Sequence, residues 1–234
     1  MCRMQCRAFL FDMDGVLVDS TPAVARVWSR WGTIHGFDPE WATKLAHGRP
    51  SLHTLRELLP DASPEVHQRE NRWLEQAEIE DVKDVVGFPG TAEFLSTLPP
   101  SQFAVVTSAT RKLAEVRLEA AGVLKLARNM VTFDDITRGK PDPEPYLKGA
   151  ALLKVPPAEC IVVEDAPSGV RSGKAAGARV VALRTTTTDS ELLAAGADWI
   201  VNDCASLRLR SATPGGKLEI ELNTSEVPRA PKMS

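Results

Sequence analysis

Ala8-Phe9-Leu10-Phe11-Asp12-Met13-Asp14-Gly15 is the stretch that decides the fold, because a short apolar run ends there in two carboxylates and a glycine. Side chains at positions i and i+2 of a β-strand point to the same face, so Asp12 and Asp14 can reach one site. Gly15 permits a sharp backbone turn directly afterwards. The pattern predicts a strand that presents, at its carboxyl end, a magnesium-bound nucleophile with a proton-transfer partner beside it.

Two other interpretations of this stretch are weaker. A calcium loop of the EF-hand kind also begins with alternating acids, but it places its glycine at the sixth position and ends in a glutamate. Here Gly15 is fourth, counted from Asp12. A pair of solvated acids at a strand end stays open on this stretch alone, because short motifs produce false positives.

Length and composition limit the class of protein. The 234 residues suit one large domain or a core with a smaller inserted domain. Hydrophobic residues make up 43% of the chain, enough for a substantial core. The net charge of −3 does not provide the excess of positive charge that is typical of nucleic-acid-binding proteins, so we expect no nucleic-acid partner. No segment approaches the run of about 20 apolar residues that spans a bilayer, so we expect no membrane partner.

The cysteines and the amino terminus indicate the compartment. The four cysteines form no Cys-x-x-Cys pair, and Cys160 precedes an apolar run as a small core residue would. Residues 1–7 run straight into the first predicted strand, which leaves no room for a signal peptide. We therefore expect a reduced, cytoplasmic enzyme. No strong interface stripe stands out, and we expect a monomer.

Short apolar runs alternate with helical patterns along much of the chain. Helices are predicted at 112–121 and 168–176, the latter with Pro167 in its first turn. The alternation predicts an α/β fold, a doubly wound parallel sheet (a Rossmann-like core) with helices on both faces. Ligands in such sheets bind beyond the carboxyl ends of the strands, where the acid pair falls. The predicted strands are 8–13, 103–107, 129–133, 160–164, 179–183 and 199–201.

Residues 20–86 have a different character. Apolar residues recur there at helical spacing with no convincing strand, and four of the five tryptophans fall in this block, which suggests a small core of its own. We interpret 20–86 as an all-helical cap inserted after the first strand, with hinges near 18–21 and 86–90. The catalytic core then comprises residues 1–19 and 87–209.

A C-terminal β-hairpin is predicted next. Leu207 and Leu209 alternate with arginines, residues 213–216 carry a turn pattern, and 217–222 alternate as a half-exposed strand does. We assign 210–222 to the terminal hairpin strand. Residues 223–234 contain two prolines and few apolar groups, and we expect them to be disordered.

Three further groups of polar residues follow predicted strands. Thr107 and Ser108 could receive phosphate oxygens, although such a pair also makes an ordinary helix cap. Lys140 precedes a rigid Pro-x-Pro turn, where a solvated loop lysine is an equally good interpretation. Glu164 and Asp165 end a fully apolar strand, where carboxylates are costly unless paired or metal-bound. Helix capping by Asp165 is the competing account.

Together these groups resemble the motifs of the haloacid dehalogenase superfamily, in the branch with a helical cap after the first strand. The resemblance reaches from the amino terminus to about residue 209, and its four motifs correspond in order to Asp12 with Asp14, Thr107, Lys140, and Glu164 with Asp165. The stretches 19–24, 46–49, 139–147 and 164–170 are similar to those of small sugar and polyol phosphatases. Those enzymes include the 2-deoxyglucose-6-phosphate, glycerol phosphate and hexose phosphate phosphatases.

The resemblance implies a Mg²⁺-dependent phosphatase acting on small sugar or polyol phosphates. It implies that Asp12 forms an aspartyl phosphate and that Asp14 serves as general acid and base. It further implies Mg²⁺ ligation by the Asp12 carboxylate, the Asp14 backbone carbonyl and Asp165, with Glu164 in an outer or water-mediated position. Charge on the transferring phosphoryl oxygens would be neutralised by Thr107, the Ser108 N–H and Lys140.

Other activities share parts of this pattern. A hexose-phosphate mutase of the same branch uses the same intermediate, but such mutases carry a histidine early in the first cap helix, where this chain has Val24. Dehalogenases and phosphonate hydrolases have no use for a second acid like Asp14, and a phosphoryl-pump ATPase would be far longer. A catalytically silent binding module is the alternative from a different class.

Substrate contacts from the cap are predicted at His47 and Arg49, in a glycine-containing loop between two cap helices, where the family places such contacts. A solvated loop is the other interpretation. We expect Arg49→Ala to raise KM for sugar phosphates more than KM for p-nitrophenyl phosphate, because only the sugar reaches the cap. Steady-state kinetics with both substrates measure this, and equal effects would argue against a specificity role.

Overall fold

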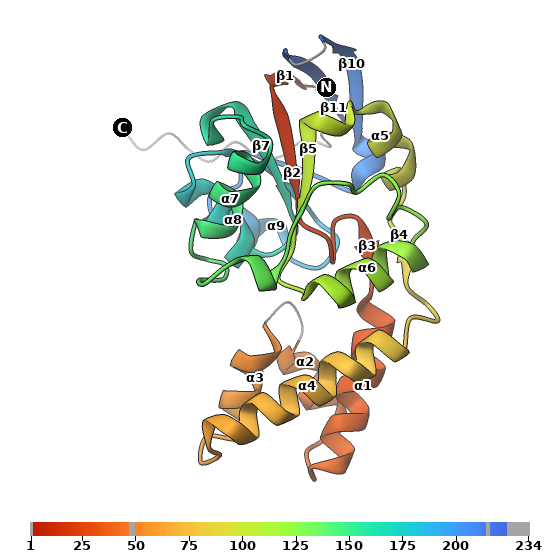
Figure 1. Cartoon of the computed structure of the whole chain (residues 1–234), viewed down its shortest axis with the longest axis vertical. Helices are drawn as coiled ribbons and strands as arrows, with labels where there is room; N and C mark the ends of the chain where they lie inside the picture. Colours follow the sequence, from red (N-terminus) through yellow and green to blue (C-terminus); the bar gives the residue numbers. More distant parts are fainter. Residues whose placement is uncertain (1, 47–49, 214–215, 224–234) are drawn as a thin grey trace.

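The computed structural model describes residues 2–46, 50–213 and 216–223, and its centre is a six-stranded parallel sheet of order β6-β5-β2-β7-β8-β9 (Figure 1). Every neighbouring pair of these strands is parallel. The doubly wound α/β fold predicted from the sequence is confirmed. The strands are β2 (Ala8–Phe11), β5 (Phe103–Val106), β6 (Met130–Val131), β7 (Cys160–Glu164), β8 (Arg179–Leu183) and β9 (Trp199–Val201).

Three of the six strands, β7 to β9, have the predicted bounds, and the others are shorter. The strand predicted at 129–133 is cut to two residues because Phe133 begins a 3₁₀ turn. β2 lies between β5 and β7, so the acid pair that follows it leaves the sheet near its middle. Four short 3₁₀ turns accompany the sheet: η1 (Pro100–Gln102), η2 (Phe133–Asp135), η3 (Pro157–Glu159) and η4 (Cys204–Ser206).

Alternate residues of each strand divide the core between two faces of the sheet, as the two-residue period requires. Phe9 and Phe11 pack on one face with α5 (Thr91–Thr97) and α6 (Arg111–Ala120). Ala8 and Leu10 pack on the other face. The helices there are α7 (Glu144–Leu152), α8 (Pro167–Ala175) and α9 (Asp189–Ala194).

A second, antiparallel sheet covers part of the first face. β10 (Leu207–Ala212) and β11 (Leu218–Leu222) form the predicted C-terminal hairpin, and β1 (Cys2–Cys6) pairs with the free side of β11. Their inward residues join the cluster that holds Val181 and Val201 of β8 and β9. The sheet therefore closes a stretch of core that α5 and α6 leave open. Sequence reasoning treated residues 2–6 only as a lead into the first strand, which was wrong.

Four helices lie outside the sheet layers, at one end of the molecule (Figure 1). They share an apolar cluster of their own, which includes Trp28, Trp31 and Leu74. A two-stranded ladder of β3 (Val18–Asp19) and β4 (Val86–Gly87) lies where the chain leaves the sheet region and returns to it. The helices are α1 (Thr21–Ile34), α2 (Pro39–Ala46), α3 (Ser51–Leu58) and α4 (Pro64–Glu80).

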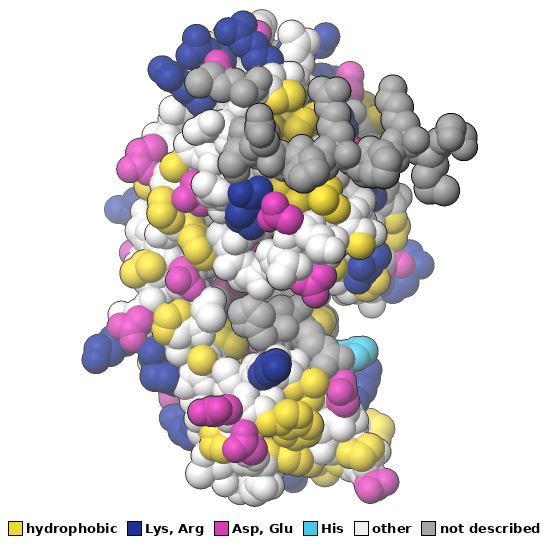
Figure 2. Space-filling view, turned by 180° about the vertical axis from the view of Figure 1, so that it is seen from behind, with side chains coloured by type: hydrophobic (Ala, Val, Ile, Leu, Met, Phe, Trp, Pro, Cys, Tyr) yellow, Lys and Arg dark blue, Asp and Glu magenta, His cyan; other side chains and the backbone are white. Residues whose placement is uncertain are grey.

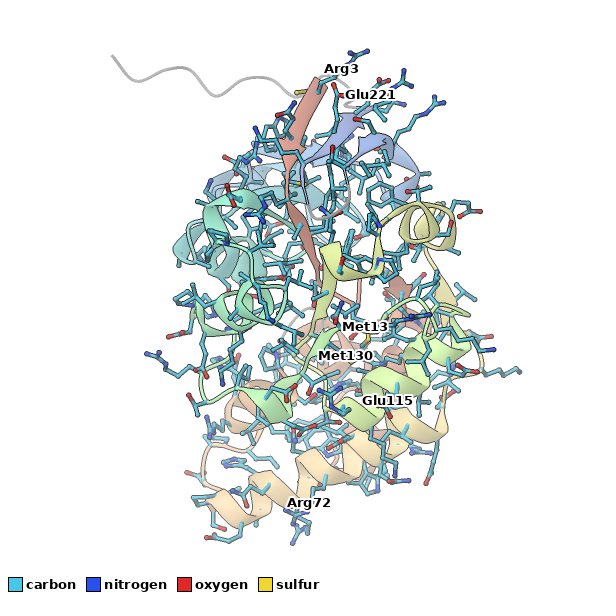
Figure 3. The ribbon with its side chains drawn as sticks, turned by 45° about the horizontal axis from the view of Figure 1, so that its top comes forward. Arg3, Met13, Arg72, Glu115, Met130 and Glu221 are labelled. Carbon is cyan, nitrogen blue, oxygen red and sulfur yellow. The ribbon has the colours of Figure 1, made fainter. Side chains whose placement is uncertain are left out.

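Charged side chains of both signs are scattered over the face shown in Figure 2, and Lys and Arg side chains gather at the end opposite the four helices. Arg3 and Glu221 of the three-stranded sheet lie together at that end (Figure 3). None of the helices in the described part of the chain combines the length and apolar character that a bilayer crossing requires. Of the predicted disordered tail, 223–234, only Asn223 is described, and its N–H donates to the Ser206 carbonyl; the rest lies outside the described residues.

The three-stranded sheet makes a direct prediction about stability. Ile220, at the middle of β11, is fully buried, whereas its neighbour Glu219 faces the other side. We expect Ile220→Ala to lower the free energy of unfolding by about 2–4 kcal/mol, because it leaves a cavity. Glu219→Ala should change it by less than about 1 kcal/mol. Urea unfolding followed by circular dichroism measures both, and a small effect of Ile220→Ala would contradict the packing role of this sheet.

Candidate active site

Lys140 links two of the predicted acids at the carboxyl edge of the sheet. Its Nζ lies 2.8 Å from Asp12 Oδ1 and 2.7 Å from Glu164 Oε1, and it donates to the Val106 carbonyl at 3.1 Å. The side chain is only 6% exposed. The interpretation of Lys140 as a solvated loop lysine is therefore wrong. Burial opposes its charge, but the carboxylates of Asp12 and Glu164 outweigh this and hold the pKa of Lys140 above its usual value.

Glu164 is held by hydrogen bonds on both carboxylate oxygens. Oε1 accepts from Lys140 and from the hydroxyl of Tyr146, at 2.7 Å each. Oε2 accepts from the backbone N–H groups of Asp165 and Ala166. The side chain is fully buried, and a Cβ added at Gly169 would lie 1.6 Å from Oε1, so α8 can approach it only with glycine at that position. Glu164 thus fixes Lys140 and has little capacity left for another partner.

Asp165 is arranged differently. It is 4% exposed, and one oxygen, Oδ2, accepts from the hydroxyl of Thr186. The other, Oδ1, is buried without a hydrogen-bond partner in the part of the chain that the structure describes. The N-cap of α8 is Ala166, so helix capping by Asp165 is excluded. Gly15, at φ +79°, passes so close that a Cβ there would lie 2.0 Å from Oδ2, which explains the glycine after the acid pair.

Asp12, Glu164 and Asp165 each offer one oxygen within 4.8 Å of the others. Burial raises the pKa of Asp12 to about 7, with Lys140 opposing the shift and Glu164 adding to it. Burial and the charges of Glu164 and Asp12 also raise the pKa of Asp165. Buried carboxylates at this spacing need a cation in addition to Lys140 to stay ionised. Oxygen ligands and the unpartnered Oδ1 fit Mg²⁺, which coordinates oxygen and is commonly bound by one or two carboxylates.

Asp14 lies outside this group of carboxylates. Its Oδ1 accepts a 2.6 Å hydrogen bond from the Ser20 hydroxyl, and its Oδ2 accepts one of 2.9 Å from Arg117 Nη1. The side chain is 32% exposed. The acid pair therefore divides after the strand, with Asp12 turned to Lys140 and Asp14 turned to Arg117.

Thr107 and Ser108 follow β5 at the same edge. Thr107 is 2% exposed, its N–H donates to the Val131 carbonyl, and its hydroxyl accepts from the Ala109 N–H at 3.1 Å. The N-cap of α6 is Thr110, so the alternative that Thr107 or Ser108 caps the helix is wrong. His47 and Arg49 lie outside the described residues.

Four residues that sequence reasoning missed contact the predicted acids: Ser20, Arg117, Tyr146 and Thr186. Three of them carried a detectable pattern. Tyr146 is the single tyrosine of the chain, and Thr186 stands in a run of four threonines that begins two residues after a predicted strand ends. Arg117 shares a helix face with Leu113 and Ala114, where a charge is unusual, and it is 5% exposed.

A groove of about 690 Å³ opens beside Lys140. One wall comes from α3 with Pro50 and His53, and the other from the start of α8 and the threonine run after β8. The groove thus leads from the lysine between the acids to α3.

A family model describing haloacid dehalogenase-like hydrolases matches residues 6–177 of the chain, a span that contains Asp12, Thr107, Lys140 and Asp165. The chain belongs to this family. The resemblance seen in the four motifs is thereby confirmed, and with it the assignment as a hydrolase.

Individual relatives agree with this result. Hexitol phosphatase A of Escherichia coli (strain K12) is 42% identical over 182 residues, which cover 77% of this chain and 84% of the relative. Glycerol-1-phosphate phosphohydrolase 2 of Saccharomyces cerevisiae is 32% identical over 217 residues, 88% of this chain and 86% of the relative. A putative beta-phosphoglucomutase from Thermotoga maritima superposes with a TM-score of 0.65 at 29% identity, covering 84% of this chain and 94% of that one.

The unpartnered oxygen of Asp165 yields a prediction about metal binding. We expect Mg²⁺ to raise the melting temperature of the wild-type haloacid dehalogenase-like hydrolase by several degrees, because saturation at about 100 times Kd stabilises a protein by about 2.7 kcal/mol. Asp165→Asn should lose most of this rise, whereas Glu159→Gln, a surface control paired with Arg7, should keep it. Differential scanning calorimetry with and without Mg²⁺ measures the shifts. An undiminished rise in Asp165→Asn would exclude Asp165 as a ligand.

Proposed function

We propose that this protein is a Mg²⁺-dependent phosphatase that hydrolyses small sugar or polyol phosphate monoesters through an aspartyl phosphate on Asp12. The observation that carries the proposal is the buried Lys140 between Asp12 and Glu164, next to an Asp165 oxygen without a partner. The names of the relatives support a phosphorylated polyol as substrate, since hexitol and glycerol phosphates differ mainly in chain length.

In the first step, a carboxylate oxygen of Asp12 attacks phosphorus in line with the leaving oxygen. A P–O bond forms to Asp12, the P–O bond to the substrate breaks, and Asp14 gives its proton to the departing oxygen, which leaves as an alcohol. In the second step water attacks the aspartyl phosphate and gives its proton to Asp14. Inorganic phosphate leaves and Asp12 is restored.

Several groups hold the transferring phosphoryl group. Lys140, the Thr107 hydroxyl and the Ser108 N–H neutralise charge on its oxygens. Mg²⁺, held by Asp12, Asp165 and the Asp14 backbone carbonyl with Glu164 as an outer partner, supplies further charge neutralisation when bound. Glu164 suits the outer position because its four hydrogen bonds already use both oxygens.

The helices of residues 20–86 act in this proposal as a cap that covers the phosphate and contacts the rest of the substrate. Residues 1–19 and 87–209 form the catalytic core, and 210–222 complete the terminal hairpin. The groove between α3 and the start of α8 gives the sugar or polyol room to extend from Lys140. We propose His47 and Arg49 as the substrate contacts of the cap. A reduced cytoplasm suits the described cysteines, all of which are free thiols, and we propose a monomer.

A mutase is the second candidate, because a putative beta-phosphoglucomutase is among the similar structures. Val24, at the position where such mutases carry histidine, packs against the apolar cluster of the four helices and offers no polar group for a second proton transfer. Following glucose 1-phosphate by NMR separates the two activities, since a mutase gives the 6-phosphate and a phosphatase gives glucose. A silent binding module would give neither product.

The nucleophile is tested by Asp12→Asn. We expect kcat for hexitol and glycerol phosphates to fall by about 10⁴-fold or more, because an amide cannot form the acyl phosphate. Phosphate release is the measurement, and circular dichroism checks that the fold is intact. Glu159→Gln serves again as the surface control. Substantial turnover by folded Asp12→Asn would refute the aspartyl phosphate, and an inactive wild type across a panel of sugar and polyol phosphates with Mg²⁺ would refute the phosphatase itself.

A further inference from the structure

Arg117 of α6 is a buried cation with one carboxylate on each of its terminal nitrogens. Nη1 donates to Asp14 Oδ2 and Nη2 donates to Glu78 Oε2, both at 2.9 Å. Arg117 is 5% exposed and Glu78 is 6% exposed. Burial raises the pKa of Glu78 while Arg117 lowers it. The two carboxylates belong to different parts of the chain, because Asp14 follows the central strand and Glu78 lies on α4.

The contact lies where α6 runs beside α4, as the labelled Glu115 and Arg72 on these helices indicate (Figure 3). A second contact crosses the same boundary: the Thr110 hydroxyl donates to Glu75 Oε1 at 2.5 Å. Among the described residues, no hydrogen bond joins that pair to Asp12, Asp14, Lys140 or Asp165. Arg117 is therefore distinguished from an ordinary helix–helix contact by its bond to Asp14.

The other oxygen of Asp14 is bound at the start of the same group of four helices. Ser20 occupies the N-cap position of α1, but its side chain makes no capping bond and donates instead to Asp14 Oδ1. A serine at this position ordinarily caps the helix. The Asp14 carboxylate is thus held by the residue that begins α1 and, through Arg117, by a residue near the end of α4.

We propose that Arg117 is a positioning residue for proton transfer, which holds the Asp14 carboxylate and makes its placement depend on the position of α4. The guanidinium is planar and its two donors have a fixed relative direction. If Glu78 shifts with α4, the Arg117 guanidinium therefore rotates, and the position at which it holds the Asp14 carboxylate changes. This inference rests on the proposed function of Asp14 as the acid that protonates the leaving oxygen.

The choice of leaving group separates positioning from a general structural role. A sugar or polyol oxygen must receive a proton as its P–O bond breaks, whereas p-nitrophenolate leaves without one. Because kcat/KM reports the steps through cleavage of that bond, loss of a well-placed acid lowers it for the polyol ester alone. A general structural defect lowers both values.

We expect Arg117→Met to reduce kcat/KM for a hexitol or glycerol phosphate by about 10–100-fold, within the range that general acid catalysis supplies. The value for p-nitrophenyl phosphate should change by less than about 3-fold on the same grounds. Arg117→Lys keeps the charge but has a single nitrogen in place of the two guanidinium donors. It should recover only part of the lost kcat/KM for the polyol phosphate. Glu78→Gln should show the same selectivity to a smaller extent. Glu75→Gln is the matched control, because it alters an α4–α6 contact that no described hydrogen bond joins to Arg117 or Asp14, and it should leave kcat/KM for both substrates nearly unchanged.

A double-mutant cycle with Asp14→Ala gives the second test. If Arg117 acts through Asp14, Arg117→Met should cost about 10–100-fold in the wild-type background and little in the Asp14→Ala background. Equal losses in both backgrounds would overturn the proposal, as would equal losses on both substrates. Where Arg117→Met fails to fold by circular dichroism, Arg117→Lys and Glu78→Gln decide by the same criterion. A wild type inactive on every phosphate ester would instead overturn the phosphatase and this inference with it.

Discussion

The site depends on one buried interaction, the Lys140 ammonium between the carboxylates of Asp12 and Glu164. The ends of three neighbouring strands meet in it, because Asp12 follows β2, Glu164 ends β7, and the lysine also donates to the Val106 carbonyl at the end of β5. Removing one partner of a buried pair typically costs about 3–5 kcal/mol, since a charge is left uncompensated. The network therefore ties the ends of these strands together and supplies part of the positive charge that the buried carboxylates require.

The two acids at the end of β7 illustrate how local packing gives adjacent residues different tasks. Glu164 faces α7 and α8, where Tyr146 and two backbone N–H groups satisfy it and Gly169 leaves room for it. Asp165 faces the turn after β2, where Gly15 makes room, and one of its oxygens is bound only by Thr186. The saturated carboxylate orients the lysine, and the unsaturated one is suited to a metal ion. Glu164 and Asp165 could exchange these roles only if Gly169 and Gly15, which make room for them, also changed position.

The sequence predicted the sheet and the convergence of Asp12, Lys140, Glu164 and Asp165, because these depend on local periodicity and on residues at strand ends. It missed β1, since a short strand of alternating burial has no partner visible in its own sequence, and the partner β11 lies more than 200 residues away. The contacts of Asp14 were missed for the same reason. Arg117 comes 103 residues later, and no local pattern tells which carboxylate a buried arginine will meet. Local sequence patterns determine which residues reach the sheet edge. Contacts between residues far apart in the sequence determine the direction in which each side chain points.

Asp14 shows why that second kind of information matters for function. The motif places it two residues after Asp12, yet β2 ends at Phe11 and the two side chains do not share one environment. Asp12 is held entirely by the core, whereas Asp14 is held by Ser20 at the start of α1 and by an arginine bound to α4. Asp12, the proposed nucleophile, is positioned by the sheet and therefore does not depend on the helices for its placement. In the proposed mechanism, an acid and base held by the surrounding helices is correctly placed only when those helices are. Protonation of the leaving oxygen would then be coupled to the part of the molecule proposed to contact the rest of the substrate.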